Sequence, residues 1–317
     1  MTGPAASVVV PTHGGAKRLP VLLAALAAQD TEDFEVVPVV DGDVDGSEAV
    51  LRGWTDRLAV RPVVFEQNRG RAAALNAGAA AAAGHILIRC DDDLEPWPDF
   101  VSGHVARHAG EASGVVGLTT NAFPDTPYAR AYGRQANARS IAAALALPAQ
   151  RTWRLWSANV SVPADLHARL GGYDGRYRRY GWEDVDFGYR LHRAGLPVVV
   201  APELMAIHHG ASTTTATRAV RALHSGAARE TFVAIHGAAA LEEFDGPPGP
   251  VRRGWWDRLV RGTSALATER TLRAYGRLVD AAVPRLPPAI AEKAIALAVE
   301  SAGKAGVRYP KRARGTF

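Results

Sequence analysis

Cysteine is nearly absent from this chain of 317 residues, in which Cys90 is the only one. A single cysteine excludes an intrachain disulfide and a cysteine cluster that binds metal. Long apolar runs are absent as well, because no stretch reaches the roughly 18 uninterrupted apolar residues that a membrane-spanning helix needs. The opening residues, MTGPAASVVVP, lack the basic segment and apolar core of a secretory signal. We therefore expect a cytoplasmic protein, with a peripheral position at the inner face of the membrane left open.

Excess positive charge is missing from most of the chain. Residues 251–317 hold 14 Lys or Arg and 5 Asp or Glu, whereas residues 1–250 hold 23 basic and 27 acidic residues. Contacts to nucleic-acid phosphates need basic side chains at the binding site. Because the basic residues are concentrated at one end, we expect no nucleic-acid partner for the body of the protein.

Short runs of valine and isoleucine alternate with helical patterns in the first hundred residues. The runs are ASVVVP, FEVVPVVD, RPVVFE and HILIR. This alternation predicts an α/β protein with a Rossmann-like, mainly parallel sheet flanked by helices. Ligands of such sheets bind beyond the carboxyl ends of the strands. The polar segments PTHGG, DGDVDG, EQNRG and CDDD follow the four runs and are therefore candidates for a binding site.

The second half of the chain is less regular. GVVGLTT and LPVVVAP predict strands, RTWRLWSANVSVP predicts an extended segment, and PYARAYGRQANARSIAAALAL and EDVDFGYRLHRAG predict helices. The Pro/Gly-rich segment DGPPGP then marks a linker. We therefore predict a body at residues 1–245 and a basic, helical C-terminal extension at residues 246–317.

Three aspartates, Asp91, Asp92 and Asp93, follow the apolar run HILIR. Neighbouring carboxylates cost free energy unless a cation or hydrogen bonds offset their repulsion. A solvated acidic loop is one interpretation, and a divalent-cation site that holds a phosphorylated ligand is the other. On an extended or turning backbone Asp91 and Asp93 can face the same side, and carboxylate oxygens suit Mg²⁺ or Mn²⁺.

Five segments in order resemble the family 2 glycosyltransferases with a GT-A fold, over about Ser7 to Ser212. They are VVVPTHGGAKRL, VVDGDVDGS, NRGRAAALNAG, CDDD as a DxD-type metal motif, and GGYDGRYRRYGWEDVDFGYRL on the acceptor side. The resemblance implies a catalytic domain at residues 1–245, with a nucleotide-sugar half at about 1–115 and an acceptor half at about 116–245. It also implies a hexosyltransferase that moves a sugar from a nucleoside-diphosphate sugar to a hydroxyl acceptor with inversion.

The resemblance assigns roles to particular residues. Asp93, Asp91 and His208 would hold Mn²⁺ or Mg²⁺, with His209 as the alternative to His208. Asp184 would be the general base, and Glu183 would orient the acceptor. Acidic residues at the start of a helix are also favoured by the helix dipole alone, so a purely structural role for this pair stays open.

The nucleotide-sugar site implied by the resemblance is larger. It comprises Pro11, Thr12, His13, Asp41, Arg69, Arg71, Asp91, Asp92 and Trp156. Gly42 stands where the family usually has a second Asp, so the choice of base stays open, with uridine favoured. Arg69 and Arg71 lie at a helix start, where backbone N–H groups favour phosphate; two solvated arginines are the alternative.

Two other functions remain open from the sequence. A sugar-1-phosphate nucleotidyltransferase shares the type of fold, although PTHGGAKRL lacks the full Gly-rich signature of that class. A non-catalytic nucleotide- or carbohydrate-binding protein is the second. The basic extension either contacts a membrane surface, packs on the body of the chain or mediates a homodimer.

Overall fold

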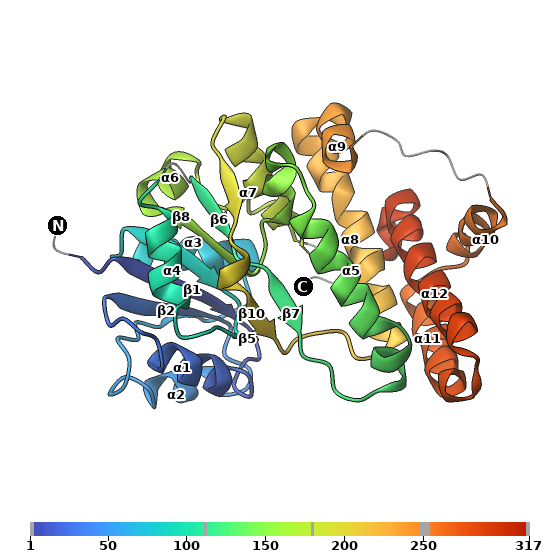
Figure 1. Cartoon of the computed structure of the whole chain (residues 1–317), viewed down its shortest axis with the longest axis horizontal. Helices are drawn as coiled ribbons and strands as arrows, with labels where there is room; N and C mark the ends of the chain where they lie inside the picture. Colours follow the sequence, from blue (N-terminus) through green and yellow to red (C-terminus); the bar gives the residue numbers. More distant parts are fainter. Residues whose placement is uncertain (1–2, 111–112, 179–180, 247–253, 315–317) are drawn as a thin grey trace. The chain divides into compact units, whose positions relative to one another are not determined.

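A computed structural model describes residues 3–110, 113–178, 181–246 and 254–314 (Figure 1). The chain divides into two compact units. The first contains Met1–Ala122, Ile141–Gly175 and Glu183–Gly210, and the second contains Phe123–Ser140, Arg176–Trp182 and Ala211–Phe317.

A seven-stranded sheet forms the centre of the first unit. Its order is β3 (Val63–Phe65), β2 (Phe34–Asp41), β1 (Ala6–Thr12), β4 (Ile86–Cys90), β8 (Asn159–Pro163), β6 (Gly114–Val116) and β9 (Val198–Val200). β8 runs antiparallel to both of its neighbours, and the other six strands run in one direction. The predicted mainly parallel sheet is confirmed. A smaller sheet joins β5 (Leu94–Glu95), β10 (Ala206–His208) and β7 (Thr119–Asn121).

Helices flank this sheet because its central strands carry apolar side chains on both faces. They are α1 (Leu19–Ala27), α2 (Ser47–Arg52), α3 (Arg71–Ala81), α4 (Phe100–Arg107), α6 (Ala164–Arg169), α7 (Trp182–Arg193) and the short η3 (Pro202–Leu204). The helix α5 (Arg134–Leu145) is divided between the two units. Val8 and Val10 of β1 share a core with Leu22 of α1. On the other face α3 lies against the sheet: a Cβ at Gly78 would be 2.4 Å from Cγ1 of Val9.

The prediction of an extended segment over RTWRLWSANVSVP is wrong in its first half. Ala149–Leu155 forms a 3₁₀ helix, η2, and the strand β8 begins only at Asn159. The hydroxyl of Thr152 donates to the carbonyls of Ala149 and Val198, at 2.8 and 2.5 Å, and holds this turn closed. The predicted helix after residue 127 begins with a π-helical turn, η1 (Ala129–Gly133).

Helices make up the second unit. They include α8 (Thr215–His236), α9 (Ala238–Asp245), α10 (Trp255–Ser264), α11 (Glu269–Ala282), α12 (Pro288–Arg308) and the short η4 (Val283–Arg285) and η5 (Pro310–Arg312). Small residues let α8 and α12 approach closely, since a Cβ at Gly306 would be 2.1 Å from the carbonyl oxygen of Leu223. Across the described ranges, no helix is both long and apolar enough to cross a membrane.

The predicted boundary at Asp245 lies inside this second unit. Ala219, Leu223 and Ala227 of α8 share a buried cluster with three alanines of α12, at positions 298, 302 and 305. Asp280 of α11 accepts hydrogen bonds from the backbone and the hydroxyl of Thr215, where α8 begins. Helices before and after residue 245 therefore share one core, and a separate catalytic domain ending at Asp245 stays a prediction.

Candidate active site

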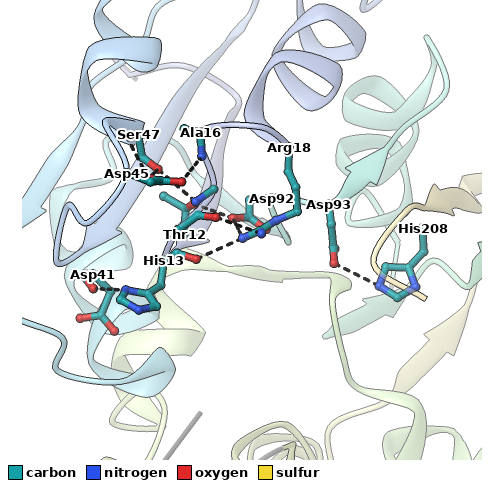
Figure 2. Close-up of polar contacts among 12 residues, drawn as sticks. Thr12, His13, Ala16, Arg18, Asp41, Asp45, Ser47, Asp92, Asp93 and His208 are labelled. Carbon is teal, nitrogen blue, oxygen red and sulfur yellow. Dashed lines mark hydrogen bonds and ion pairs between the residues drawn. The ribbon is translucent and has the colours of Figure 1, made fainter. Parts of the chain in front are cut away.

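The strand-end residues predicted from the sequence lie at one edge of the large sheet. β1 ends at Thr12, β2 at Asp41 and β4 at Cys90, and these strands are parallel neighbours. Their carboxyl ends therefore meet. Pro11 and Thr12 are buried at the end of β1, and the ring nitrogen Nδ1 of His13 lies 2.8 Å from the carbonyl oxygen of Asp41 (Figure 2).

The Asp41 carboxylate is engaged by the backbone that opens α3. It accepts hydrogen bonds from the N–H groups of Arg69 and Gly70, at 2.5 and 2.8 Å. Gly70 has a φ of 91°, which favours glycine at this turn. Each carboxylate oxygen retains a further lone pair. Asp41 thus fixes the loop that carries Arg69, whose guanidinium lies 4.6 Å from the centre of the Phe65 ring.

Asp92 is held inside the protein. It accepts hydrogen bonds from the hydroxyl of Thr12 at 2.5 Å and from Nε and Nη2 of Arg18 at 2.9 and 2.7 Å (Figure 2). Burial raises the pKa of Asp92, and the hydrogen bonds from Arg18 and Thr12 oppose this effect. These contacts connect the aspartate triplet to the turn after β1. Asp92, taken as a whole residue, is only 6% exposed. Sequence reasoning missed Arg18.

Asp93 and His208 face each other, with 3.3 Å between Oδ2 and Nε2 (Figure 2). The other ring nitrogen of His208 lies 2.6 Å from Oδ1 of Asn121, which fixes the ring. Burial alone would raise the pKa of Asp93, but the hydrogen bond and charge of His208 hold it below its usual value. His209 instead contacts Glu95, at 2.7 Å. The structure therefore brings the ring of His208, and not that of His209, to the Asp93 carboxylate, while the His209 backbone N–H donates to the Asp93 carbonyl oxygen at 2.8 Å.

A divalent cation fits these groups only in part. Within the described ranges, no three His, Cys, Asp or Glu side chains are grouped so as to hold a metal ion. Asp91 is paired with Arg89, at 2.9 Å between Oδ1 and Nε. Two protein ligands nevertheless suit Mg²⁺ or Mn²⁺, which are commonly bound by one or two carboxylates together with substrate phosphates and water. Asp93 and His208 are the pair that fits this description.

Glu183 and Asp184 lie in the first turn of α7 and meet two arginines. Asp184 accepts a hydrogen bond from Nη1 of Arg89, and Glu183 lies 3.2 Å from Nη1 of Arg71. Burial raises the pKa of Asp184, and the charge of Arg89 works in the opposite direction. Oε2 of Glu183 is buried without a hydrogen-bond partner in the described part of the chain. This oxygen can accept a hydrogen bond from a water molecule or from a bound hydroxyl group.

Arg89 is a second residue that sequence reasoning missed. It lies on β4 with a side chain only 4% exposed, and it contacts both Asp91 and Asp184. The signal was present in HILIRC, where one arginine interrupts an apolar strand. A buried arginine needs carboxylate partners, so its position pointed to the acidic residues around it.

The acceptor-side segment is anchored to α3. Asn76 donates to the carbonyl oxygen of Tyr173 at 2.8 Å and accepts from the Tyr173 N–H at 2.7 Å. The Tyr173 hydroxyl accepts from Nε1 of Trp156 at 3.0 Å. Trp156 is only 2% exposed and stacks on Phe187. Its predicted role in the nucleotide-sugar site stays a prediction; in this structure the ring packs in the core.

Similarity to known proteins agrees with this arrangement. Residues 7–160 match the family model described as glycosyl transferase family 2. Validoxylamine A glucosyltransferase of Streptomyces hygroscopicus subsp. jinggangensis is 33% identical over 233 residues, which cover 64% of this chain and 55% of that protein. The protein of the same name from subsp. limoneus is also 33% identical over 233 residues, covering 64% and 51%. The chain thus spans about half the length of the curated relatives it matches.

Two solved structures share the fold. Mannosyltransferase PcManGT from Pyrobaculum calidifontis, in complex with GDP-Man and Mn²⁺, has a TM-score of 0.64 and 20% identity, covering 98% of this chain and 89% of that one. S. aureus TarS 1-349, in complex with UDP-GlcNAc, has a TM-score of 0.57 and 16% identity, covering 96% and 91%. The predicted GT-A fold is confirmed. This fold, its strand-end motifs and the match over residues 7–160 together support a family 2 glycosyltransferase.

Proposed function

We propose that this protein transfers a sugar from a nucleoside-diphosphate sugar to a hydroxyl acceptor. The observation that carries the proposal is the pair of acidic residues at the start of α7. Asp184 is buried with a raised pKa, and Glu183 beside it has a buried oxygen that no described residue satisfies. Attack by an acceptor hydroxyl requires two groups: a carboxylate that can take the proton and a carboxylate that can accept a hydrogen bond from the hydroxyl.

The donor would bind at the edge formed by β1, β2 and β4. Arg71 and Arg69 stand at the start of α3, where the backbone N–H groups also favour a diphosphate. Pro11, Thr12, His13 and Asp41 border the place expected for the base. A UDP-sugar remains our preferred donor. The two solved structures with this fold hold GDP-Man in one case and UDP-GlcNAc in the other, so the fold admits either base.

Asp93 and His208 would hold Mn²⁺ or Mg²⁺, with Asp91 as a further ligand if it leaves Arg89. The cation, when bound, neutralises charge on the leaving diphosphate. In the proposed reaction Asp184 accepts the proton of the acceptor hydroxyl as that oxygen attacks the anomeric carbon. With Asp184 as the one base, the configuration at this carbon inverts. Glu183 orients the acceptor, and Arg71 holds Glu183.

Similarity to glycosyl transferase family 2 favours sugar transfer over the nucleotidyltransferase and the non-catalytic binding protein. For the cellular setting we propose a cytoplasmic enzyme whose C-terminal helices make a peripheral contact with the inner face of the membrane. A homodimer through these helices is the alternative.

A screen of nucleotide-sugar hydrolysis with and without Mn²⁺ tests the proposal. We expect one donor, most readily a UDP-sugar, to be hydrolysed slowly and only with the metal. Product anomers from a subsequent acceptor screen test inversion. If none of the UDP-, GDP-, ADP- and dTDP-sugars is bound or hydrolysed in either condition, the proposed function is wrong.

A further inference from the structure

The exposed apolar side chains of this chain are concentrated in α10–α12 and the turns beside them. Of the twelve large apolar side chains that are exposed in the described residues, seven lie between residues 254 and 314. They are Trp255, Leu259, Leu266, Tyr275, Leu278, Ile290 and Val307. Single exposed apolar residues are ordinary, but a concentration of them marks an interaction surface.

The spacing of these residues places them on shared helix faces. Trp255 and Leu259 are four apart on α10, and Leu266 lies in the turn that follows this helix. Tyr275 and Leu278 are three apart on α11. Leu266 and Tyr275 also line, with Leu272 and Leu297, an apolar hollow of about 200 Å³ between the three helices. We call this surface, centred on Leu266, Tyr275 and Leu278, the α10–α12 face.

Positive charge next to this face is not neutralised. Arg270 and Arg277 lie two turns apart on α11, each about a quarter turn around the helix from Leu278, whereas Arg273 between them pairs with Glu269. All five acidic residues between 254 and 314 are engaged: Asp257 by Lys304, Glu269 by His224, Asp280 by Thr215, Glu292 by Arg139 and Glu300 by Trp256. By contrast, Arg258, Arg270 and Arg277 are exposed and make no ion pair with any described residue.

We propose that the α10–α12 face docks on an anionic lipid bilayer. Its leucines and aromatic rings enter the boundary between headgroups and acyl chains, and the flanking arginines meet lipid phosphates. This names the partner of the peripheral contact proposed above. It does not depend on the proposed catalytic residues, all of which lie outside residues 254–314, so failure of one proposal leaves the other intact.

Vesicle co-sedimentation of the full chain tests the proposal. We expect binding to phosphatidylcholine vesicles that contain phosphatidylglycerol, little binding to phosphatidylcholine alone, and release by salt. Each basic residue near anionic lipid contributes about fivefold in affinity, so Arg270→Gln/Arg277→Gln should weaken binding by about 30-fold. Leu266→Ser/Leu278→Ser should also weaken it and should leave the salt dependence in place.

Matched controls come from the first unit. Arg52→Gln/Arg57→Gln removes the same charge from exposed positions there, and Val21→Ser/Leu145→Ser removes exposed apolar side chains. Both controls should bind vesicles like the parent protein. Equal binding by all variants, or no binding by the parent in low salt, overturns the proposal. If the parent is instead a dimer in solution that Leu266→Ser/Leu278→Ser converts to a monomer, with no effect of lipid, the face is a self-association surface and the proposal is wrong.

Discussion

Arg89 on β4 donates a hydrogen bond from Nη1 to the carboxylate of Asp184 on α7, across 95 positions of sequence. Both side chains are nearly buried, at 4% and 9% exposed. The same guanidinium contacts Asp91, at 2.9 Å between Nε and Oδ1. One arginine therefore fixes the proposed base relative to the aspartate triplet, and removal of either partner leaves a buried charge without its main counterion.

Replacing Asp184 by Asn should abolish most sugar transfer while donor binding persists. A positioned general base contributes on the order of 10²-fold or more to the rate, and an amide cannot accept the acceptor proton. Transfer and donor affinity are measured separately, by product formation and by calorimetry with a nucleoside diphosphate. Asp165→Asn, at an exposed position of α6, is the control and should retain activity. Transfer by Asp184→Asn at the parental rate would assign the base to another residue.

Arg89→Met should lower the free energy of unfolding by about 3–5 kcal/mol, the range for breaking a buried ion pair from one side. Because Asp184→Asn removes the unpaired charge, the double variant Arg89→Met/Asp184→Asn should be less destabilised than the sum of the single variants. Denaturant titration measures all four proteins. Arg52→Met, at a side chain 72% exposed, should stay within about 0.5 kcal/mol of the parent. Additive effects of the two buried substitutions would show that Arg89 and Asp184 are not coupled.

As the pH is lowered, the rate of sugar transfer should begin to fall at a higher pH than in an enzyme whose base is an exposed aspartate. Burial raises the pKa of Asp184, and only the ionised carboxylate can take a proton. As pH falls through this raised pKa, the base is lost first. Asp93, whose pKa is held below its usual value, keeps its charge to lower pH. Transfer should therefore decline at a pH where calorimetry still detects donor binding; a parallel decline of both would argue against Asp184 as the titrating base.

Much of this site was predictable because its parts lie at strand ends. The parallel pattern of β1, β2 and β4 places Thr12, Asp41 and the aspartate triplet at one edge. The partner of Asp92 was not predictable from a local pattern, since Arg18 lies 74 positions away, whereas the resemblance had already assigned Asp93 and His208 to one cation. The 3₁₀ turn at residues 149–155 was missed because the hydroxyl of Thr152 bonds a carbonyl of β9, a contact that no local pattern records.

His208→Ala should reduce metal-dependent donor binding, whereas His209→Ala should not. The two histidines are neighbours in the chain, yet His208 lies 3.3 Å from Asp93 and His209 contacts Glu95. Calorimetry with a nucleoside diphosphate, with and without Mn²⁺, separates them, and Asp93→Asn should resemble His208→Ala. Equal effects of both histidine substitutions would mean that the Asp93–His208 pair does not hold the cation.

Cutting the chain after Asp245 should lower the helical content by more than the removed helices account for. The sequence predicts a body that ends at residue 245, but α8 buries Ala219, Leu223 and Ala227 in a cluster shared with α12. Loss of α10–α12 would expose this apolar strip of α8 to water, and the removal of Asp280 would leave the Thr215 N–H at the start of α8 without its acceptor. We expect residues 1–245 to aggregate on size-exclusion chromatography.

Ala302→Asp in the full chain is a milder test, because it places a charge in the same cluster and should destabilise α8 without shortening the protein. A monomeric 1–245 fragment that keeps α8 helical by circular dichroism and still hydrolyses donor would show that the catalytic domain ends at Asp245.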